Sequence, residues 1–185
     1  MGDAITNHKI NVQLVICALG NDRVGLFREL AQGILDSGCS ILDSRMAALG
    51  SEFAAMLLVA GNWNSIAKLE GALPTLQDKL KLTLTSRRTE ARAAQGNLLP
   101  YMVEVVTVDR PGVLYRLADF FASRHINIED LYTASYTSTH SDTNMFNVNI
   151  TVNVPADVHI AGLREEFLNL CDELNLDGVL EPLKR

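Results

Sequence analysis

The sequence has few cysteines, and none of them is placed to hold a metal or to form a paired motif. Cys17, Cys39 and Cys171 are the three cysteines of 185 residues, and they lie far apart. Their odd number fits reduced thiols in a cytoplasmic protein. We predict that all three lie in or near the hydrophobic core, and that the chain needs no metal and no cofactor.

Long apolar runs and an excess of positive charge are also missing. No stretch approaches the roughly 18 uninterrupted apolar residues that span a bilayer, and residues 1–9 lack the apolar segment of a secretion signal. The net charge of −6 provides no basic stripe for a phosphate backbone. We therefore predict a cytoplasmic protein that binds neither a membrane nor nucleic acid directly.

Motifs of catalysis are missing as well. The four histidines show no metal spacing, and the chain has no nucleophile elbow, phosphate-binding loop or zinc-protease motif. What the chain does contain is 48% hydrophobic residues, which is ample for a packed core. We predict a binding protein rather than an enzyme.

An internal repeat organises the chain. Two apolar segments each end in an Asp-Arg-x-Gly sequence, and an amphipathic helical pattern follows each glycine. The repeated residues are Asp22, Arg23 and Gly25 in the first copy and Asp109, Arg110 and Gly112 in the second. A β-rich run, a hairpin, a third strand, a second helix and a short last strand then follow in both copies.

This order predicts an α+β protein of two tandem ferredoxin-like βαββαβ domains with antiparallel four-stranded sheets. We place the first domain at residues 10–88, a polar linker at 89–99 and the second domain at 100–185. The last strands are expected at 82–86 and 178–183, and the second hairpin loop at 137–143. The third strand at 53–60 is almost entirely apolar, so we expect it to be more buried than its counterpart at 145–154.

The start of each first helix is the candidate binding site. Unpaired N–H groups and the positive end of the helix dipole favour an anion such as the carboxylate of an amino acid. Gly25 and Gly112 would let a ligand approach the backbone, and Pro111 would occupy the first helical position. The alternative is that both glycines only shape a tight turn between strand and helix.

The polar residues expected near each helix start have two possible roles each. Asp22 and Asp109 would accept from a ligand ammonium or would cap the helix. Arg23 and Arg110 would pair with a carboxylate or a partner protein, or would simply be solvated. Ser40 and Asn127, expected beside the first loop, would contact the ligand or stabilise a turn. The full set of candidate residues is Asp22, Arg23, Val24, Gly25, Leu26, Ser40, Ile41, Asp109, Arg110, Pro111, Gly112, Val113, Asn127 and Ile128.

The duplicated unit, with Asp-Arg-x-Gly after strand one and Ser/Asn-Ile-x-Asp after helix one, resembles the ACT domain. Residues 18–25, 38–45, 49–53 and 61–66 further resemble the family of transcriptional repressors of the glycine cleavage system. This resemblance implies a regulator that binds a small amino acid, glycine being favoured, and that acts by contacting a DNA-binding activator protein. It also implies a homo-oligomer, because exposed sheet edges pair.

The two halves match the family pattern unequally. Val24 stands where the pattern often has proline, and Ser40 where it often has asparagine. Pro111 and Asn127 keep both residues, so the second half retains the fuller ligand-binding pattern.

Two other functions fit parts of the sequence. An acylphosphatase-like enzyme also uses a ferredoxin-like fold, with a loop arginine and a strand asparagine that Arg110 and Asn127 superficially match, but the longer phosphate-binding glycine pattern is missing. An ACT regulatory subunit that docks on an enzyme of amino-acid metabolism is the other alternative.

Overall fold

A computed structural model describes residues 12–90, 96–137 and 143–183. The chain divides into two compact units, Met1–Ala93 and Ala94–Arg185. Each unit contains one four-stranded antiparallel sheet and two helices in the order βαββαβ, which confirms the predicted fold class. Of the described helices, none has the length and hydropathy needed to cross a membrane.

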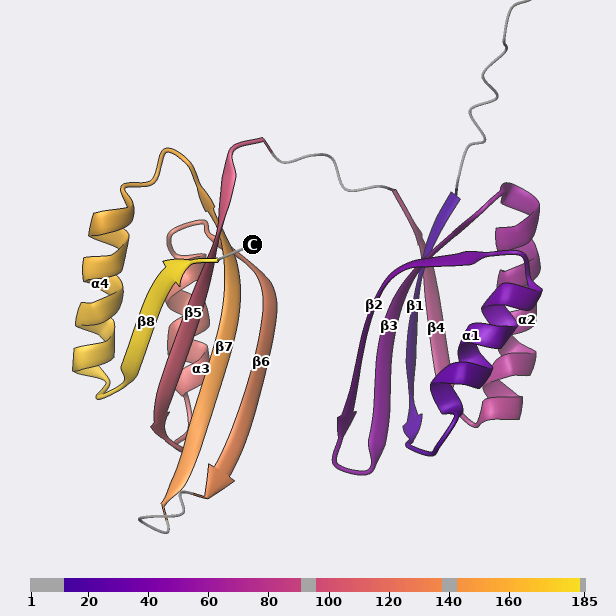
Figure 1. The fold of residues 1–185 in the computed structure, drawn as a ribbon, viewed down its shortest axis with the longest axis horizontal. Helices are drawn as coiled ribbons and strands as arrows, with labels where there is room; N and C mark the ends of the chain where they lie inside the picture. Colours follow the sequence, from indigo (N-terminus) through magenta and orange to yellow (C-terminus); the bar gives the residue numbers. More distant parts are fainter. Residues whose placement is uncertain (1–11, 91–95, 138–142, 184–185) are drawn as a thin grey trace, which may run out of the picture. The chain divides into compact units, whose positions relative to one another are not determined.

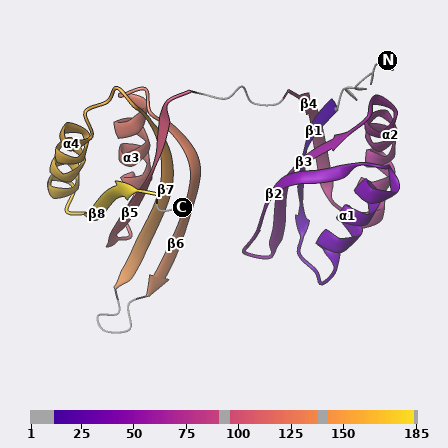
Figure 2. The same ribbon diagram turned by 45° about the horizontal axis from the view of Figure 1, so that its top comes forward.

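In the first unit, the sheet has the strand order β2-β3-β1-β4, and both helices cover the same face of it (Figures 1 and 2). The elements are β1 Val12–Asn21, α1 Leu26–Asp36, β2 Ser40–Leu49, β3 Glu52–Gly61, α2 Trp63–Leu80 and β4 Thr83–Thr89. Because β1 lies between β3 and β4, the chain leaves the end of a central strand when it enters the candidate loop.

The second unit repeats this arrangement with the order β6-β7-β5-β8, again with both helices on one face (Figure 1). Its elements are β5 Leu98–Val108, α3 Val113–Ala122, β6 Asn127–Thr137, β7 Asn144–Pro155, α4 Ile160–Glu173 and β8 Asp177–Pro182. Residues 138–142 of the predicted second hairpin loop and residues 91–95 of the predicted linker lie outside the described residues.

Alternating burial explains why these segments form sheets with one covered face. Leu14 and Ile16 of β1 are fully buried, while Cys17, which lies between the buried residues Ile16 and Ala18, is exposed. Helix α1 buries one stripe, made of Leu26, Leu30 and Ile34, against this sheet face. Burying each such side chain contributes about 1.5–3 kcal/mol.

Each unit has its own hydrophobic cluster. In the second unit, Phe121 of α3 and Phe167 of α4 are fully buried, and their rings stack with centroids 6.3 Å apart. Phe120 packs edge-on against Phe121 at 5.1 Å. These aromatic contacts join the two helices above the sheet, where the first unit uses leucine and isoleucine.

Two details differ from the predictions. Strand β4 continues to Thr89 instead of ending at residue 86, and Arg88 pairs with Leu14. Cys17 is exposed rather than buried, whereas Cys39 and Cys171 are buried as predicted. Strand β3 is more buried than β7 over the predicted ranges, as expected, although Met56 on the side turned away from the helices is 52% exposed.

Candidate functional site

The loop that enters each first helix bends at a glycine in the left-handed conformation. Gly25 has φ 85° and ψ −2°, and Gly112 has φ 91° and ψ −9°. These angles are those of the third residue of a type II turn, where a side chain would be strained. The N–H of Leu26 donates to the carbonyl of Arg23 at 3.2 Å and closes the first turn.

Pro111 lies at the second position of the corresponding turn and precedes the N-cap Gly112. The prediction that it occupies the first helical position is therefore wrong. Proline favours this turn position because its ring fixes φ near −65°. Val24 takes the same place in the first unit.

Neither leading helix has a side chain capping its N-terminus. The first intrahelical bonds are donated by Glu29 N–H to Gly25 and by Arg116 N–H to Gly112, both at 3.0 Å. The earlier N–H groups of Phe27 and Leu114 therefore have no acceptor among the described residues. Both helix starts thus present open donors.

The second helix of each unit has the cap that the first helix lacks. Asn62 accepts from the Ser65 N–H at 2.9 Å at the start of α2. His159 Nδ1 accepts from the Gly162 N–H at 3.2 Å at the start of α4. The two repeated glycine loops thus differ from the starts of α2 and α4 in having no side-chain cap.

Asp22 and Asp109 anchor the loops through their backbones and are not helix caps. Their N–H groups donate to the carbonyls of Ser51 and Asn144, each at 2.9 Å, which ties each loop to the neighbouring hairpin. The capping alternative is wrong, because no side chain caps either helix. Both carboxylates make no hydrogen bond with a described residue, and their binding of a ligand ammonium stays a prediction.

Charge distinguishes the two loops. In the first unit, Arg23 binds Glu29 through two hydrogen bonds of 2.6 and 3.0 Å, and this pairing lowers the pKa of Glu29. Sequence reasoning missed Glu29, although an acidic residue four positions after the glycine was visible. In the second unit, Arg116 takes the place of Glu29, and Arg110 has no ion-pair partner among the described residues. The first turn of α3 contains no acidic residue.

Ser40 and Asn127 lie far from the loops, so the prediction that they lie beside them is wrong. In the first unit, β1 ends with Asn21 opposite Glu52, while Ser40 pairs with Ala60 at the other end of β3. Eight residues of strand separate the two places, which is roughly 25 Å. The second unit repeats this separation, with Val108 opposite Met145 and Asn127 opposite Asn153.

The remaining candidates are buried or partly buried. Leu26 and Val113 are buried core residues, and Ile41 and Ile128 pack partly buried against the same cores. Leu26 and Val113 therefore offer a ligand only their backbone atoms. Within the part of the chain that the structure describes, no group of three or more His, Cys, Asp or Glu side chains could hold a metal ion.

Comparison with known proteins identifies similar chains. Residues 12–86 match the model of the ACT domain family, which confirms the resemblance for the first unit. Glycine cleavage system transcriptional repressors of Escherichia coli K12 and Shigella flexneri are each 34% identical over 165 residues, covering 89% of this chain and 87% of theirs.

Solved structures cover both units. A crystal structure provisionally assigned as a glycine cleavage system transcriptional repressor is 31% identical, with a TM-score of 0.73, and the match covers 95% of this chain and 99% of that one. A protein of unknown function from Galdieria sulphuraria has a TM-score of 0.76 at 22% identity, covers 94% and 99% of the two chains, and shows the shared fold alone.

Proposed function

The chain belongs to the family of glycine cleavage system transcriptional repressors, and from this membership we propose that it is a non-enzymatic sensor of a small amino acid. Glycine is the favoured ligand. One of its two forms, ligand-free or ligand-bound, would contact a DNA-binding activator protein and so control transcription. The relatives named above are described as repressors, which supports a regulatory role.

The observation that carries this proposal is the pair of uncapped helix starts behind left-handed glycines. A ligand carboxylate would accept from the open N–H groups of the first helical turn, where the helix dipole contributes about 0.3–1 kcal/mol and up to about 2 kcal/mol in partly buried sites. The carboxylates of Asp22 and Asp109 are the candidate acceptors for the ligand ammonium. A Cβ at Gly112 would have no neighbour within 4 Å, so the space beside this loop is open.

The second unit is the better site of the two. Glu29 brings a carboxylate to the first turn of α1 and engages Arg23 in an ion pair, so Arg23 is already occupied and a second carboxylate is disfavoured there. The corresponding helix α3 has no acidic residue there, and Arg110 is unpaired among the described residues. We therefore propose that the first ligand binds at Gly112 and that Gly25 binds more weakly or not at all.

Ser40, Ile41, Asn127 and Ile128 stay in the proposal only as contributions from another sheet. Because roughly 25 Å of strand separates them from the loop of their own unit, they could reach a loop-bound ligand only from a neighbouring sheet edge. The same separation argues against acylphosphatase-like catalysis, since Arg110 and Asn127 of one unit cannot meet on one phosphate.

Calorimetric titration of the full chain with glycine, alanine and serine tests the sensor. We expect binding of glycine, and the loss of this binding in Gly112→Ala with less effect from Gly25→Ala. Failure of all three amino acids to bind would refute the sensor proposal. The serine and alanine titrations rank how much side chain the site accepts.

The regulatory step is tested in Escherichia coli, whose repressor is 34% identical to this chain. A strain lacking that repressor would receive this chain, and transcription of its glycine cleavage genes would be followed with a reporter. We expect repression that changes with added glycine. The purified chain alone should not retard promoter DNA in a gel, because its net charge is −6; retardation would overturn the indirect mechanism.

A further inference from the structure

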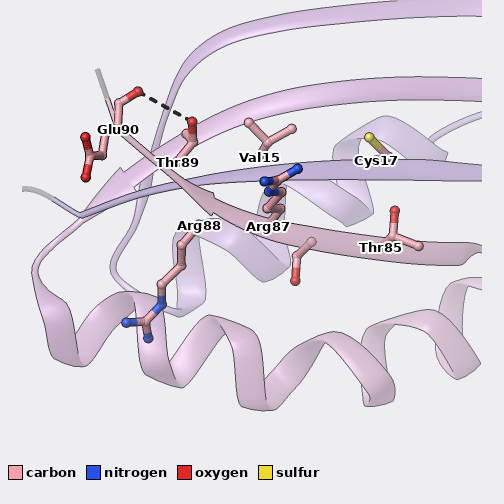
Figure 3. A pocket seen from close by; sticks show the side chains of 8 residues that line it. Val15, Cys17, Thr85, Arg87, Arg88, Thr89 and Glu90 are labelled. Carbon is pink, nitrogen blue, oxygen red and sulfur yellow. Dashed lines mark hydrogen bonds between the residues drawn. The ribbon is translucent and has the colours of Figure 1, made fainter. Parts of the chain in front are cut away.

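The first unit leaves an apolar sheet face uncovered. We call this the outer face: it is the side of the sheet turned away from α1 and α2. Its central side chains are Val15, Cys17 and Leu19 of β1 and Ala54, Met56 and Leu58 of β3. Leu19 and Met56 are each 52% exposed, and Cys17 is also exposed. Figure 3 shows Val15, Cys17 and Thr85 on this face, with Arg88 turned to the opposite side.

Charged residues border the outer face at both edges. The register places Asp43 of β2 opposite Leu58, Leu58 opposite Val15, and Val15 opposite Arg87 of β4. One row across the sheet therefore runs from an aspartate on one edge strand through two apolar residues to an arginine on the other. Arg87 has no ion-pair partner among the described residues. Asp43 at the other edge forms an ion pair with the exposed Arg45 at 2.7 Å.

The same face of the second unit lacks this character. The positions of Cys17 and Met56 are taken there by Glu104 and Asn149, which pair with each other across β5 and β7. The row equivalent to the one above contains Asp130, Thr151, Met102 and Glu181, so that both of its edges are acidic. The duplicated fold thus does not by itself require an apolar outer face.

We propose that the outer face of the first unit is the surface on which two copies of this chain associate, sheet against sheet. A two-fold axis parallel to the strands, running between the two sheets, exchanges their edges. Asp43 of one copy then lies over the partner's Arg87, and the apolar rows of the two copies meet. The second unit cannot pair in this way, because its acidic edges would face each other.

The size of the outer face is sufficient for a reversible dimer. Four strands about 4.8 Å apart and seven residues long give a flat area of roughly 450 Å² per copy. Two copies bury about 900 Å² when the faces are treated as flat, and the uneven side-chain surface adds to this area. The value is close to the roughly 1,000 Å² expected of a specific interface. Such an interface predicts association in the micromolar range rather than a permanent dimer.

Cys17 provides a direct probe, because it is the one exposed cysteine and the other two are buried. The full chain would be followed by sedimentation velocity over a dilution series, and in parallel by the rate at which a maleimide labels Cys17. We expect dimers to form with rising concentration and labelling to slow by about tenfold over the same range.

Substitutions taken from the second unit test the surface itself. The double variant Cys17→Glu with Met56→Asn should be a monomer at all concentrations, while the control Glu104→Arg in the second unit should dimerise like the native chain. Arg87→Glu should weaken the dimer about tenfold, and adding Asp43→Lys to it should restore affinity. Circular dichroism and thermal melting check that each variant folds.

Three outcomes would overturn this proposal. They are a monomer in which Cys17 labels freely at every concentration, a monomer in which Cys17 is protected because the chain covers its own outer face, and a dimer that the double substitution leaves intact. Glycine binding is measured separately by calorimetry, so failure of the dimer leaves the sensor proposal standing and failure of the sensor leaves the dimer standing.

Discussion

Replacing Gly112 by alanine separates the two roles that this residue can have, a turn former and a ligand contact. At φ 91° an alanine is strained by about 1 kcal/mol, while its Cβ meets no atom within 4 Å. For a unit the size of Ala94–Arg185, this strain lowers the melting temperature by about 4–8 °C. The protein stays folded, so ligand binding can be measured on it.

Gly50 is the matched control. It lies in the β2–β3 hairpin with φ 64°, its Cβ would also meet nothing within 4 Å, and no helix starts at it. Gly50→Ala should therefore show a similar loss of stability and unchanged affinity for glycine. Gly112→Ala should lose at least about tenfold in affinity, equivalent to about 1.4 kcal/mol, because its methyl group enters the space beside the open N–H donors.

Thermal melting and calorimetric titration together decide between the roles. If Gly112→Ala melts at the expected lower temperature and binds glycine as tightly as the native chain, the glycine only shapes the turn. The reasoning that places the ligand at this helix start would then be wrong. If both variants lose affinity equally, the loss reports strain and not contact, which also contradicts it.

Further predictions concern charge, burial and capping. Glu29→Gln removes the carboxylate from the first turn of α1, so calorimetry should show stronger anion binding in the first unit, with Arg28→Gln as the control that leaves Glu29 in place. Burial raises the pKa of the Cys171 thiol from 9.0 to about 11. Because the thiol of the unfolded chain ionises at lower pH than that of the folded chain, the free energy of unfolding is unaffected below pH 9 and falls between pH 9 and 11. Denaturation at pH 10 should show a free energy of unfolding lower by about 1.4 kcal/mol, and Cys171→Ala should abolish this decrease. Asn62→Ala removes the cap of α2 and should lower the free energy of unfolding, measured in urea, by about 1 kcal/mol. Asn64→Ala, two residues after the cap, should change it little.

The repeat made most of the fold predictable from the sequence. Two glycines in the same context, each followed by a helix with apolar residues on one face, place strand, loop and helix in order, because these periods are local properties of the chain. The glycine loops are predictable for a similar reason, because few residues other than glycine adopt the left-handed conformation at a tight turn. The unpaired donors behind them could not be seen, because Asp22 and Asp109 looked like suitable caps.

What the sequence could not supply depends on pairing between distant segments. Ser40 follows the first helix closely, yet it lies at the opposite end of the sheet from Gly25, because α1 runs back along the whole length of β1. Cys17 sits in a continuous apolar run, and nothing in that run tells which of its two faces a helix will cover. The first error comes from treating residues close in sequence as close in space, and the second from an apolar run that does not show which of its faces is covered.

The differences between the two units indicate how a duplicated domain can divide its work. In the second unit the first turn of α3 has no acidic residue and the outer face carries Glu104 and Asn149, a combination that favours a ligand and disfavours self-association. In the first unit Glu29 occupies the helix start and the outer face is apolar. If one unit binds glycine and the other holds two chains together, substitutions should act separately: Gly112→Ala should change affinity for glycine at constant dimer affinity, and Arg87→Glu should do the reverse. Equal effects of both variants on both measurements would show that the two surfaces are coupled, and the division of work would have to be abandoned.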